Sequence, residues 1–241
     1  MSKCTKTRVE YGDLGWNFFP GCLHRQQGVC PVKNCWAKDI ERRFHGNPDF
    51  TPTLRPEFLG APLSRRKPAR ILVNFMGDLF GDWVDPNQQV FYEGGYNSLS
   101  EIVHFVCRSC PQHAFLFLTK APWNIKKWGD WPDNCWMGAT ATSTDAFVRA
   151  MDALLKVKAA HFWVSLEPLS EWRIDQYILD ADLTAQRIGW IVVGAQSRPN
   201  IMPKLEWVRD IVEAADKVGI TVFVKEPMAS AFGIQRQEYP K

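Results

Sequence analysis

Three cysteines that could bind a metal stand close together in one short loop. Cys22, Cys30 and Cys35 are spaced C-x7-C-x4-C, and Gly21 and Gly28 give the loop backbone freedom to turn. Three thiolates suit two kinds of inorganic group. A [4Fe–4S] cluster on three cysteines keeps one iron open for a ligand, whereas zinc needs a fourth protein ligand. The spacing therefore predicts a metal centre and leaves its identity open.

The cysteines allow other interpretations. His24 or His45 is near enough in sequence to complete a zinc site. Three buried thiols without a ligand would be expected in apolar elements, and this loop is polar. A second pair, Cys107 and Cys110, ends the apolar helical run "EIVHFVCRSC", which predicts a place in the core. The chain has 7 cysteines, and an odd number argues against a complete disulfide framework.

The elements that must position these groups follow a β/α pattern. Short runs rich in β-branched and aromatic residues alternate with segments of helical period, which favours parallel strands linked by helices. We expect an α/β fold, a complete or partial β/α (TIM-like) barrel in a single domain over residues 1–241, with the cluster-binding loop at 20–36; a doubly wound open sheet is the alternative. The predicted strands are 14–20, 70–76, 114–120, 135–141, 161–167, 189–195 and 220–226, and the predicted helices are 35–45, 86–109, 143–157 and 204–218.

Polar residues recur where the apolar runs stop. In β/α barrels the reactive groups collect at the carboxyl ends of the strands, so these positions are candidates for a site. A polar strand end is also what an ordinary protein would show, and position alone does not make any one of them a ligand contact. The candidates at these ends are Asn74, Asp78, Thr119, Lys120, Thr140, Thr142, Ser165, Glu167, Gln196, Ser197, Lys225 and Glu226.

Charge is uneven along the chain although the formal net charge is only +3. The first 70 residues hold 13 Lys and Arg against 6 Asp and Glu, whereas the rest hold 16 against 20. The stretches "RRFHG" and "LSRRKPAR" carry much of the excess, and they form either a phosphate-binding surface or a solvated face. The start of the chain is polar and no apolar run spans a membrane, so we expect a cytoplasmic protein with reduced thiols and no membrane partner.

Nearly end to end, the chain resembles a phage-associated three-cysteine family that is similar to a branch of the radical SAM superfamily. The resemblance rests on "WNFFPGC" running into "CWA", then "LRPEFL", "RRKPARILVNFMGDLF", "FLFLTK", "NCWMGATA", "WVSLEPL", "WIVVGAQS" and "VFVKE", in this order. Two features depart from the family. Four residues rather than the usual two separate Cys30 from Cys35, and "GAQS" replaces "GGES", so that Gln196 stands where the family has an acid.

The resemblance implies a cofactor arrangement. Cys22, Cys30 and Cys35 would ligate a [4Fe–4S] cluster whose fourth iron binds S-adenosylmethionine, and reductive cleavage would release a 5′-deoxyadenosyl radical that abstracts hydrogen. The protein's part is to hold the cofactor in register and to exclude water. Asn74 and Asp78 would meet the methionine group, and Ser165 and Glu167 the ribose. The resemblance also implies cofactor contacts at Thr140 and Gln196, and substrate or carboxylate contacts at Lys120 and Lys225.

The substrate implied by the resemblance is a modified nucleobase in phage DNA, for example an amino-acid-modified thymine that a radical SAM isomerase rearranges. A base in duplex DNA would have to be flipped out to reach a buried radical. The implied partners are a reductant of flavodoxin or ferredoxin type and DNA bearing the modified base, in the host cytoplasm. Two alternatives stay open: a radical SAM enzyme for a peptide or small metabolite, and a zinc-stabilised nucleic-acid-binding module without catalysis.

Overall fold

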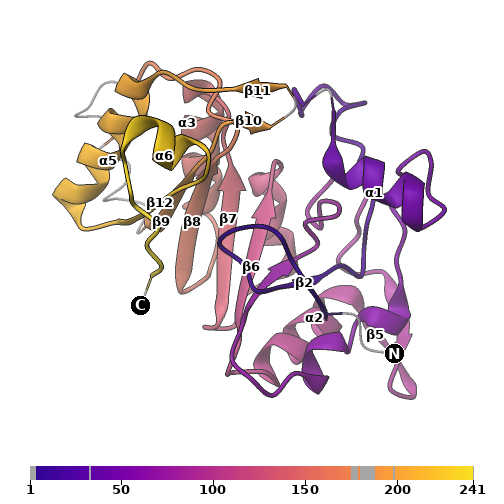
Figure 1. Ribbon diagram of the computed structural model, residues 1–241. Helices are drawn as coiled ribbons and strands as arrows, with labels where there is room; N and C mark the ends of the chain where they lie inside the picture. The colour runs from indigo at the N-terminus through magenta and orange to yellow at the C-terminus, as the bar shows by residue number, and fades with distance from the viewer. Residues whose placement is uncertain (1–3, 33, 175–178, 180–187, 198, 241) are drawn as a thin grey trace. The chain divides into compact units, whose positions relative to one another are not determined.

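A computed structural model describes residues 4–32, 34–174, 179, 188–197 and 199–240 of the chain (Figure 1). The chain divides into two compact units. The first comprises Met1–Trp136 with Lys158–Ala160, and the second comprises Met137–Val157 with His161–Lys241. The prediction of a single domain over residues 1–241 stays a prediction.

The first unit is built on parallel strands. Strand β2 (Leu14–Trp16) pairs in parallel with β3 (Arg70–Val73), β3 pairs in parallel with β6 (Ala114–Thr119), and β1 (Cys4–Lys6) lies antiparallel to β2. The other elements of this unit are α1 (Trp36–Phe44), η1 (Pro56–Phe58), η2 (Ala61–Ser64), β4 (Gln89–Tyr92), β5 (Gly95–Ser98), α2 (Leu99–Arg108) and η3 (Pro122–Trp128).

The second unit repeats the parallel pattern. Strand β9 (Ile188–Val193) pairs in parallel with β8 (His161–Leu166) on one side and with β12 (Thr221–Val224) on the other, as Figure 1 shows. Strand β7 (Cys135–Thr140) begins at the boundary between the units. The remaining elements are α3 (Thr144–Leu154), β10 (Gln196–Ser197), β11 (Asn200–Ile201), α5 (Leu205–Val218) and α6 (Met228–Phe232).

Among the described residues, eight strands form one mostly parallel sheet in the order β1-β2-β3-β6-β7-β8-β9-β12. The fold is therefore mixed α/β, as the alternation of strand and helix patterns predicted. Each predicted strand is present, but the observed strands are shorter at their carboxyl ends, where the polar residues begin. Closure of the sheet into a TIM-like barrel stays a prediction.

The prediction of one helix over 86–109 is wrong in its first half. Residues 89–98 form the antiparallel hairpin β4–β5, and the helix α2 begins only at Leu99. The hairpin turn places Glu93 at φ 49° and Gly94 at φ 89°, the pair of left-handed residues that a tight two-residue turn requires. Ser98 then starts the helix with a capping box, because its hydroxyl accepts from the Glu101 N–H and the Glu101 carboxylate accepts from the Ser98 N–H.

Three tryptophans of the strands lie in the core. Trp16, Trp163 and Trp190 are fully buried, and the rings of Trp163 and Trp190 pack with centroids 5.3 Å apart. Trp16 donates its indole N–H to the Phe58 carbonyl oxygen at 2.9 Å. These three rings fill the interior and are not available to stack on a nucleobase.

Candidate functional site

The cysteine loop leaves the carboxyl end of β2 through a very close approach of two backbone segments. Gly21 donates its N–H to the Met76 carbonyl at 3.0 Å and forms an isolated bridge with Gly77. Gly21 has φ 99°, and a Cβ there would lie 2.4 Å from the Thr51 carbonyl oxygen. A Cβ on Gly77 would lie 2.6 Å from the Gly21 carbonyl oxygen. Both positions need glycine, so the entrance of the loop is fixed against the segment that follows β3.

Two of the three thiols share one small apolar cluster. Cys22 and Cys35, both half-buried, pack against the cluster formed by Ala37, Phe50 and Met76. The Cys22 N–H donates to the Phe50 carbonyl at 3.1 Å, which ties the first cysteine to the loop that follows α1. The structure therefore brings Cys22 and Cys35, 13 residues apart in sequence, to one apolar cluster. The cysteine spacing predicted that these thiols would lie close together.

The third thiol, Cys30, is also half-buried, and its N–H donates to the His24 carbonyl at 3.1 Å. Burial raises the pKa of Cys22 to about 12, and the charges of Asp78 and Cys30 add to the rise. The His24 N–H and the Lys120 ammonium oppose it, because both stabilise the thiolate. Cys22 is therefore a protonated thiol at neutral pH, and a metal would have to displace its proton.

The thiols are gathered but not assembled into a ligand set. In the described part of the chain, which omits residue 33, no three His, Cys, Asp or Glu side chains stand in a metal-binding arrangement. Both histidines considered as zinc ligands already have a carboxylate partner: His24 Nε2 lies 2.7 Å from Asp78, and His45 Nδ1 lies 2.8 Å from Glu41. Histidines that bind zinc through one ring nitrogen commonly donate the other to a carboxylate, so these contacts are compatible with zinc binding, and the buried His24 Nδ1 has no hydrogen-bond partner among the described residues.

Asp78 is the centre of the buried polar structure beneath the loop. Its Oδ2 accepts from His24 Nε2 at 2.7 Å, from the Thr119 hydroxyl at 2.9 Å and from the Lys120 N–H at 2.9 Å. Its Oδ1 accepts from the Phe80 N–H at 3.0 Å. The carboxylate thus joins the cysteine loop to the segments that follow β3 and β6.

The surroundings of Asp78 favour its ionised form. Burial alone would raise the pKa of this carboxyl, but the hydrogen bond and charge of His24, with the Lys120 N–H and the Thr119 hydroxyl, hold it below the usual value. An ionised carboxylate has no proton to give, so His24 Nε2 carries the proton of their hydrogen bond. The His24 ring, 2% exposed, also packs edge-on against Trp83 with centroids 4.8 Å apart.

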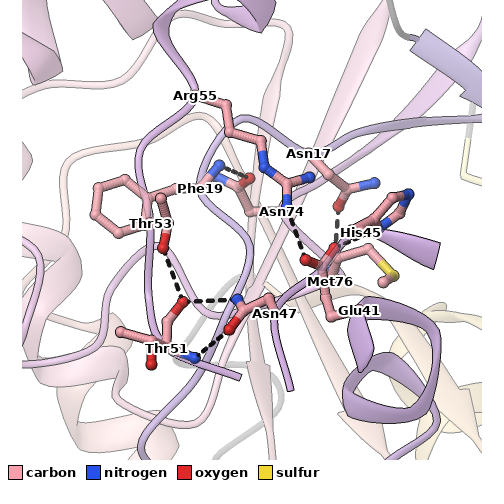
Figure 2. A network of polar contacts seen from close by, with 10 residues as sticks. All are labelled: Asn17, Phe19, Glu41, His45, Asn47, Thr51, Thr53, Arg55, Asn74 and Met76. Atoms are coloured by element: carbon pink, nitrogen blue, oxygen red, sulfur yellow. Dashed lines mark hydrogen bonds and ion pairs between the residues drawn. The ribbon is translucent and has the colours of Figure 1, made fainter. Parts of the chain in front are cut away.

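Asn74 holds the backbone on the other side of the loop entrance. It follows β3 with a left-handed φ of 55°, and its Oδ1 accepts from the Phe19 N–H at 2.9 Å. Asn17 makes the matching contact, since its Oδ1 accepts from the Met76 N–H at 3.0 Å (Figure 2). The Asn74 Nδ2 is buried and has no hydrogen-bond partner among the described residues. This buried donor is available to a bound group.

A second buried carboxylate orders the segment after α1. Glu41, 1% exposed, bonds His45 Nδ1 at 2.8 Å and the Arg55 guanidinium at 2.7 Å (Figure 2). Asn47 donates to and accepts from the backbone of Thr51, each at 2.9 Å, and closes the turn between them. Sequence reasoning missed Glu41 and Asn17. The only signal was a carboxylate facing His45 at helical spacing.

The other predicted site residues belong to the second unit. Glu167 forms an ion pair with Lys225, and both side chains are partly exposed. A Cβ on Gly194 would lie 2.9 Å from Glu167 Cγ and 3.3 Å from Lys225 Cδ, so a glycine there makes room for the pair. Ser165 is buried, and its hydroxyl has no partner in the part of the chain that the structure describes.

Thr140 and Gln196 complete the predicted set in the second unit. Thr140 ends β7 and is buried. Gln196 lies in the short strand β10, and its Nε2 donates to the Pro199 carbonyl at 3.3 Å. The first unit therefore holds the cysteines with Asn74, Asp78 and Lys120, and the second holds Thr140, Ser165, Glu167, Gln196 and Lys225.

Comparison with known proteins gives one result. A family model described as "Protein of unknown function (DUF5131)" matches residues 6–231. No curated protein and no solved structure matches the chain. None of the helices in the described ranges has the length and hydropathy needed to cross a bilayer.

Proposed function

The chain belongs to the DUF5131 family, and we propose that it is a radical SAM enzyme. In this proposal Cys22, Cys30 and Cys35 hold a [4Fe–4S] cluster that binds S-adenosylmethionine. The observation that carries the proposal is the loop itself: it places three half-buried cysteines after β2, and its His24 is hydrogen-bonded to the buried carboxylate of Asp78. A loop of disordered or purely structural cysteines would not need this anchoring.

The chemistry of the donor set fits such a cluster. Thiolates are the usual ligands of iron–sulfur clusters, and three of them leave one iron open. The Lys120 ammonium and the His24 N–H both favour the ionised form of Cys22, as a metal ligand requires. Hydrogen bonds to a cluster's sulfur ligands also tune its potential, and the His24 N–H is placed to make one. The His24 backbone N–H and the Lys120 ammonium would therefore stabilise Cys22 as a thiolate ligand.

When bound, the cluster and S-adenosylmethionine would supply reductive cleavage of a sulfonium and radical hydrogen abstraction. The residues of this chain do the positioning. Asp78 keeps the loop against the ends of β3 and β6 through His24, Thr119 and Lys120. The unpartnered Nδ2 of Asn74 is a donor for a carboxylate or carbonyl of the bound cofactor.

The second unit supplies the remaining groups of the proposal. The buried Ser165 hydroxyl and the partly exposed Glu167 would contact the ribose of the cofactor. Thr140 and Gln196 would make further contacts with the cofactor. Lys225 and Lys120 would bind the substrate. In this proposal the mostly parallel sheet forms a complete or partial β/α barrel, and each of these groups lies near or beyond the carboxyl end of a strand.

For the substrate we propose a modified nucleobase in phage DNA, with a flavodoxin or ferredoxin as the reductant and the host cytoplasm as the location. The basic first segment supports a nucleic-acid substrate, since its excess of cations suits phosphates. Trp16, Trp163 and Trp190 are buried, so these three rings do not contribute base stacking in this proposal.

The deciding experiment is iron, sulfide and zinc analysis of the anaerobically purified protein. We expect about four irons and four sulfides per chain in the wild type and their loss in Cys30→Ala. Cys110→Ala is the matched control, because Cys110 is a buried cysteine outside the loop and should leave the metal content unchanged. One zinc and no iron after reconstitution, or equal iron in Cys30→Ala, would overturn the proposal.

A further inference from the structure

A cavity of about 620 Å³ opens at the amino ends of β2 and β3 in the first unit. Its walls are the end of β1, the turn before β2 and residues 64–69, which lead into β3. Strands β2 and β3 run parallel, and the cysteine loop leaves from the carboxyl end of β2. The cavity and the loop therefore lie at opposite ends of the same strands, and the cavity is a separate site.

The walls of this cavity are strongly basic. Lys6, Arg65, Arg66 and Lys67 line it, against a single carboxylate, Asp13. These cations come from two segments about 60 residues apart, so the fold brings them together and sequence neighbourhood alone does not. Like charges held close together repel one another and cost stability unless an anion lies between them.

The carboxylate at Asp13 does not neutralise these cations. Asp13 accepts from the Arg70 N–H at 2.8 Å and from the Arg70 guanidinium at 2.9 Å. Burial opposes ionisation of Asp13, but these bonds from Arg70 outweigh it and lower the pKa of the carboxyl. Asp13 is therefore ionised and paired with Arg70, outside the group of four cations.

Within the described residues, the four cations of the cavity have few protein partners. No ion pair forms on Lys6, Arg66 or Lys67 within the ranges that the structure describes, and the last two are exposed. Arg65 is held more firmly: its guanidinium donates to the Cys4 carbonyl at 2.5 Å, while its Nε is buried with no acceptor among the described residues. An arginine fixed by a hydrogen bond, with an unpaired donor and exposed cations beside it, suits the binding of an oxyanion.

We propose that this basic pocket, lined by Lys6, Arg65, Arg66 and Lys67, binds a phosphate group. A phosphate presents several charged oxygens to several cations at once, and the fork of an arginine matches two of them. The volume lies in the range of small-ligand pockets and is large enough for a nucleotide. The phosphate comes either from a free nucleotide or from a nucleic-acid strand laid across the pocket. The site does not depend on a cluster in the cysteine loop.

The test measures binding to the full chain purified without a cluster, so that its result is independent of the proposed radical chemistry. The probes are a short fluorescently labelled single-stranded DNA and, separately, adenosine monophosphate. The variant is Arg66→Ala with Lys67→Ala. The control is Lys126→Ala with Lys127→Ala, which removes the same charge from an exposed pair in η3, away from the cavity.

We expect the pocket variant to bind at least about tenfold more weakly than the wild type, while the control pair binds almost as well. For the DNA probe, the slope of log K against log salt should fall by roughly 1.4, since each single-strand phosphate contact contributes about 0.7. Circular dichroism should show unchanged melting, because Arg66 and Lys67 have exposed side chains.

The two probes distinguish the sources of the phosphate. Binding of DNA that adenosine monophosphate does not displace identifies a strand-binding site, and full displacement identifies a nucleotide site. Equal weakening in the pocket and control variants would reduce the effect to net charge and overturn the proposal. So would the absence of binding to both probes at low salt.

Discussion

Two carboxylates that follow parallel strands, Asp78 in the first unit and Glu167 in the second, have opposite surroundings. Asp78 has a side chain that is 5% exposed and accepts four hydrogen bonds from the protein. Glu167 has a side chain that is 27% exposed, and it forms an ion pair with Lys225. A carboxylate beyond the carboxyl end of a strand is therefore a structural anchor in the first unit and an accessible group in the second.

The difference has a bearing on ligand binding. A carboxylate oxygen has about two acceptor positions, and Asp78 Oδ2 already receives three donors. A bound ammonium group at Asp78 would have to share or displace them. Glu167 can exchange a single ammonium partner at much lower cost, because the pair is partly solvated. Of the two, Glu167 is the better candidate to touch a ligand, and Asp78 the better candidate to hold the site together.

Among the substitutions that test this contrast, Asp78→Ala is expected to lower the free energy of unfolding most. Removing the carboxylate leaves His24 and three other donors buried without an acceptor, and we expect a loss of about 3–5 kcal/mol in the free energy of unfolding. Urea unfolding followed by circular dichroism measures it. A loss below about 1 kcal/mol would show that water or a rearranged loop replaces the carboxylate.

Acid provides the control for Asp78, because its pKa is lowered in the folded state. The stability that comes from its ionised form is present above the unfolded pKa, which is about 3.9, and is lost as the pH falls from there through the folded pKa. The difference in stability between wild type and Asp78→Ala should therefore shrink below about pH 4. A constant difference across that range would contradict an ionised anchor.

The second comparison substitutes one glycine in each unit. In Gly77→Ala the new methyl group meets the backbone oxygens of Gly21 and Phe19 at 2.6 and 2.7 Å, and backbone does not move aside easily. We expect a loss of roughly 1–3 kcal/mol in unfolding free energy. In Gly194→Ala the methyl group meets the side chains of Glu167 and Lys225, which can shift.

The loss in Gly194→Ala should therefore be smaller than in Gly77→Ala, as measured by urea midpoints in the same buffer. Equal losses would mean that the Glu167–Lys225 pair is held as rigidly as the entrance of the cysteine loop. That result would erase the contrast between the two units. In Gly77→Ala we also expect reduced iron incorporation, because the methyl group pushes against the segment that carries Cys22.

The sequence predicted the elements of the sheet better than their ends. Continuous apolar runs such as residues 189–195 identify a buried strand wherever the chain places it. The hairpin at 89–98 was missed because an apolar helical period continues into α2 and outweighed the turn at Glu93 and Gly94. That turn depends on two left-handed residues, and only one of them is a glycine.

The candidate site was predicted in its types of residue but not in its pairings. Cysteine spacing indicates a loop that gathers thiols, because those residues are close along the chain. The contact between His24 and Asp78 joins residues 54 apart, and the chain gives no local sign of it. For the basic pocket, the sequence shows only an excess of positive charge. It does not show that Asp13 pairs with Arg70, because that contact depends on the pairing of β2 with β3.

Glu167→Gln is expected to change the free energy of unfolding least, and it tests most directly whether Glu167 contacts the cofactor. The substitution keeps the shape and removes one charge of a partly exposed pair, so the unfolding free energy should fall by less than about 1 kcal/mol. A double-mutant cycle with Lys225→Met isolates the pair. If Glu167 is a cofactor contact, titration calorimetry on the reconstituted protein should show weaker binding of S-adenosylmethionine in a variant that is almost as stable as the wild type. Unchanged affinity together with a coupling above about 2 kcal/mol would instead make Glu167 a second anchor, and the contrast with Asp78 would be one of exposure alone.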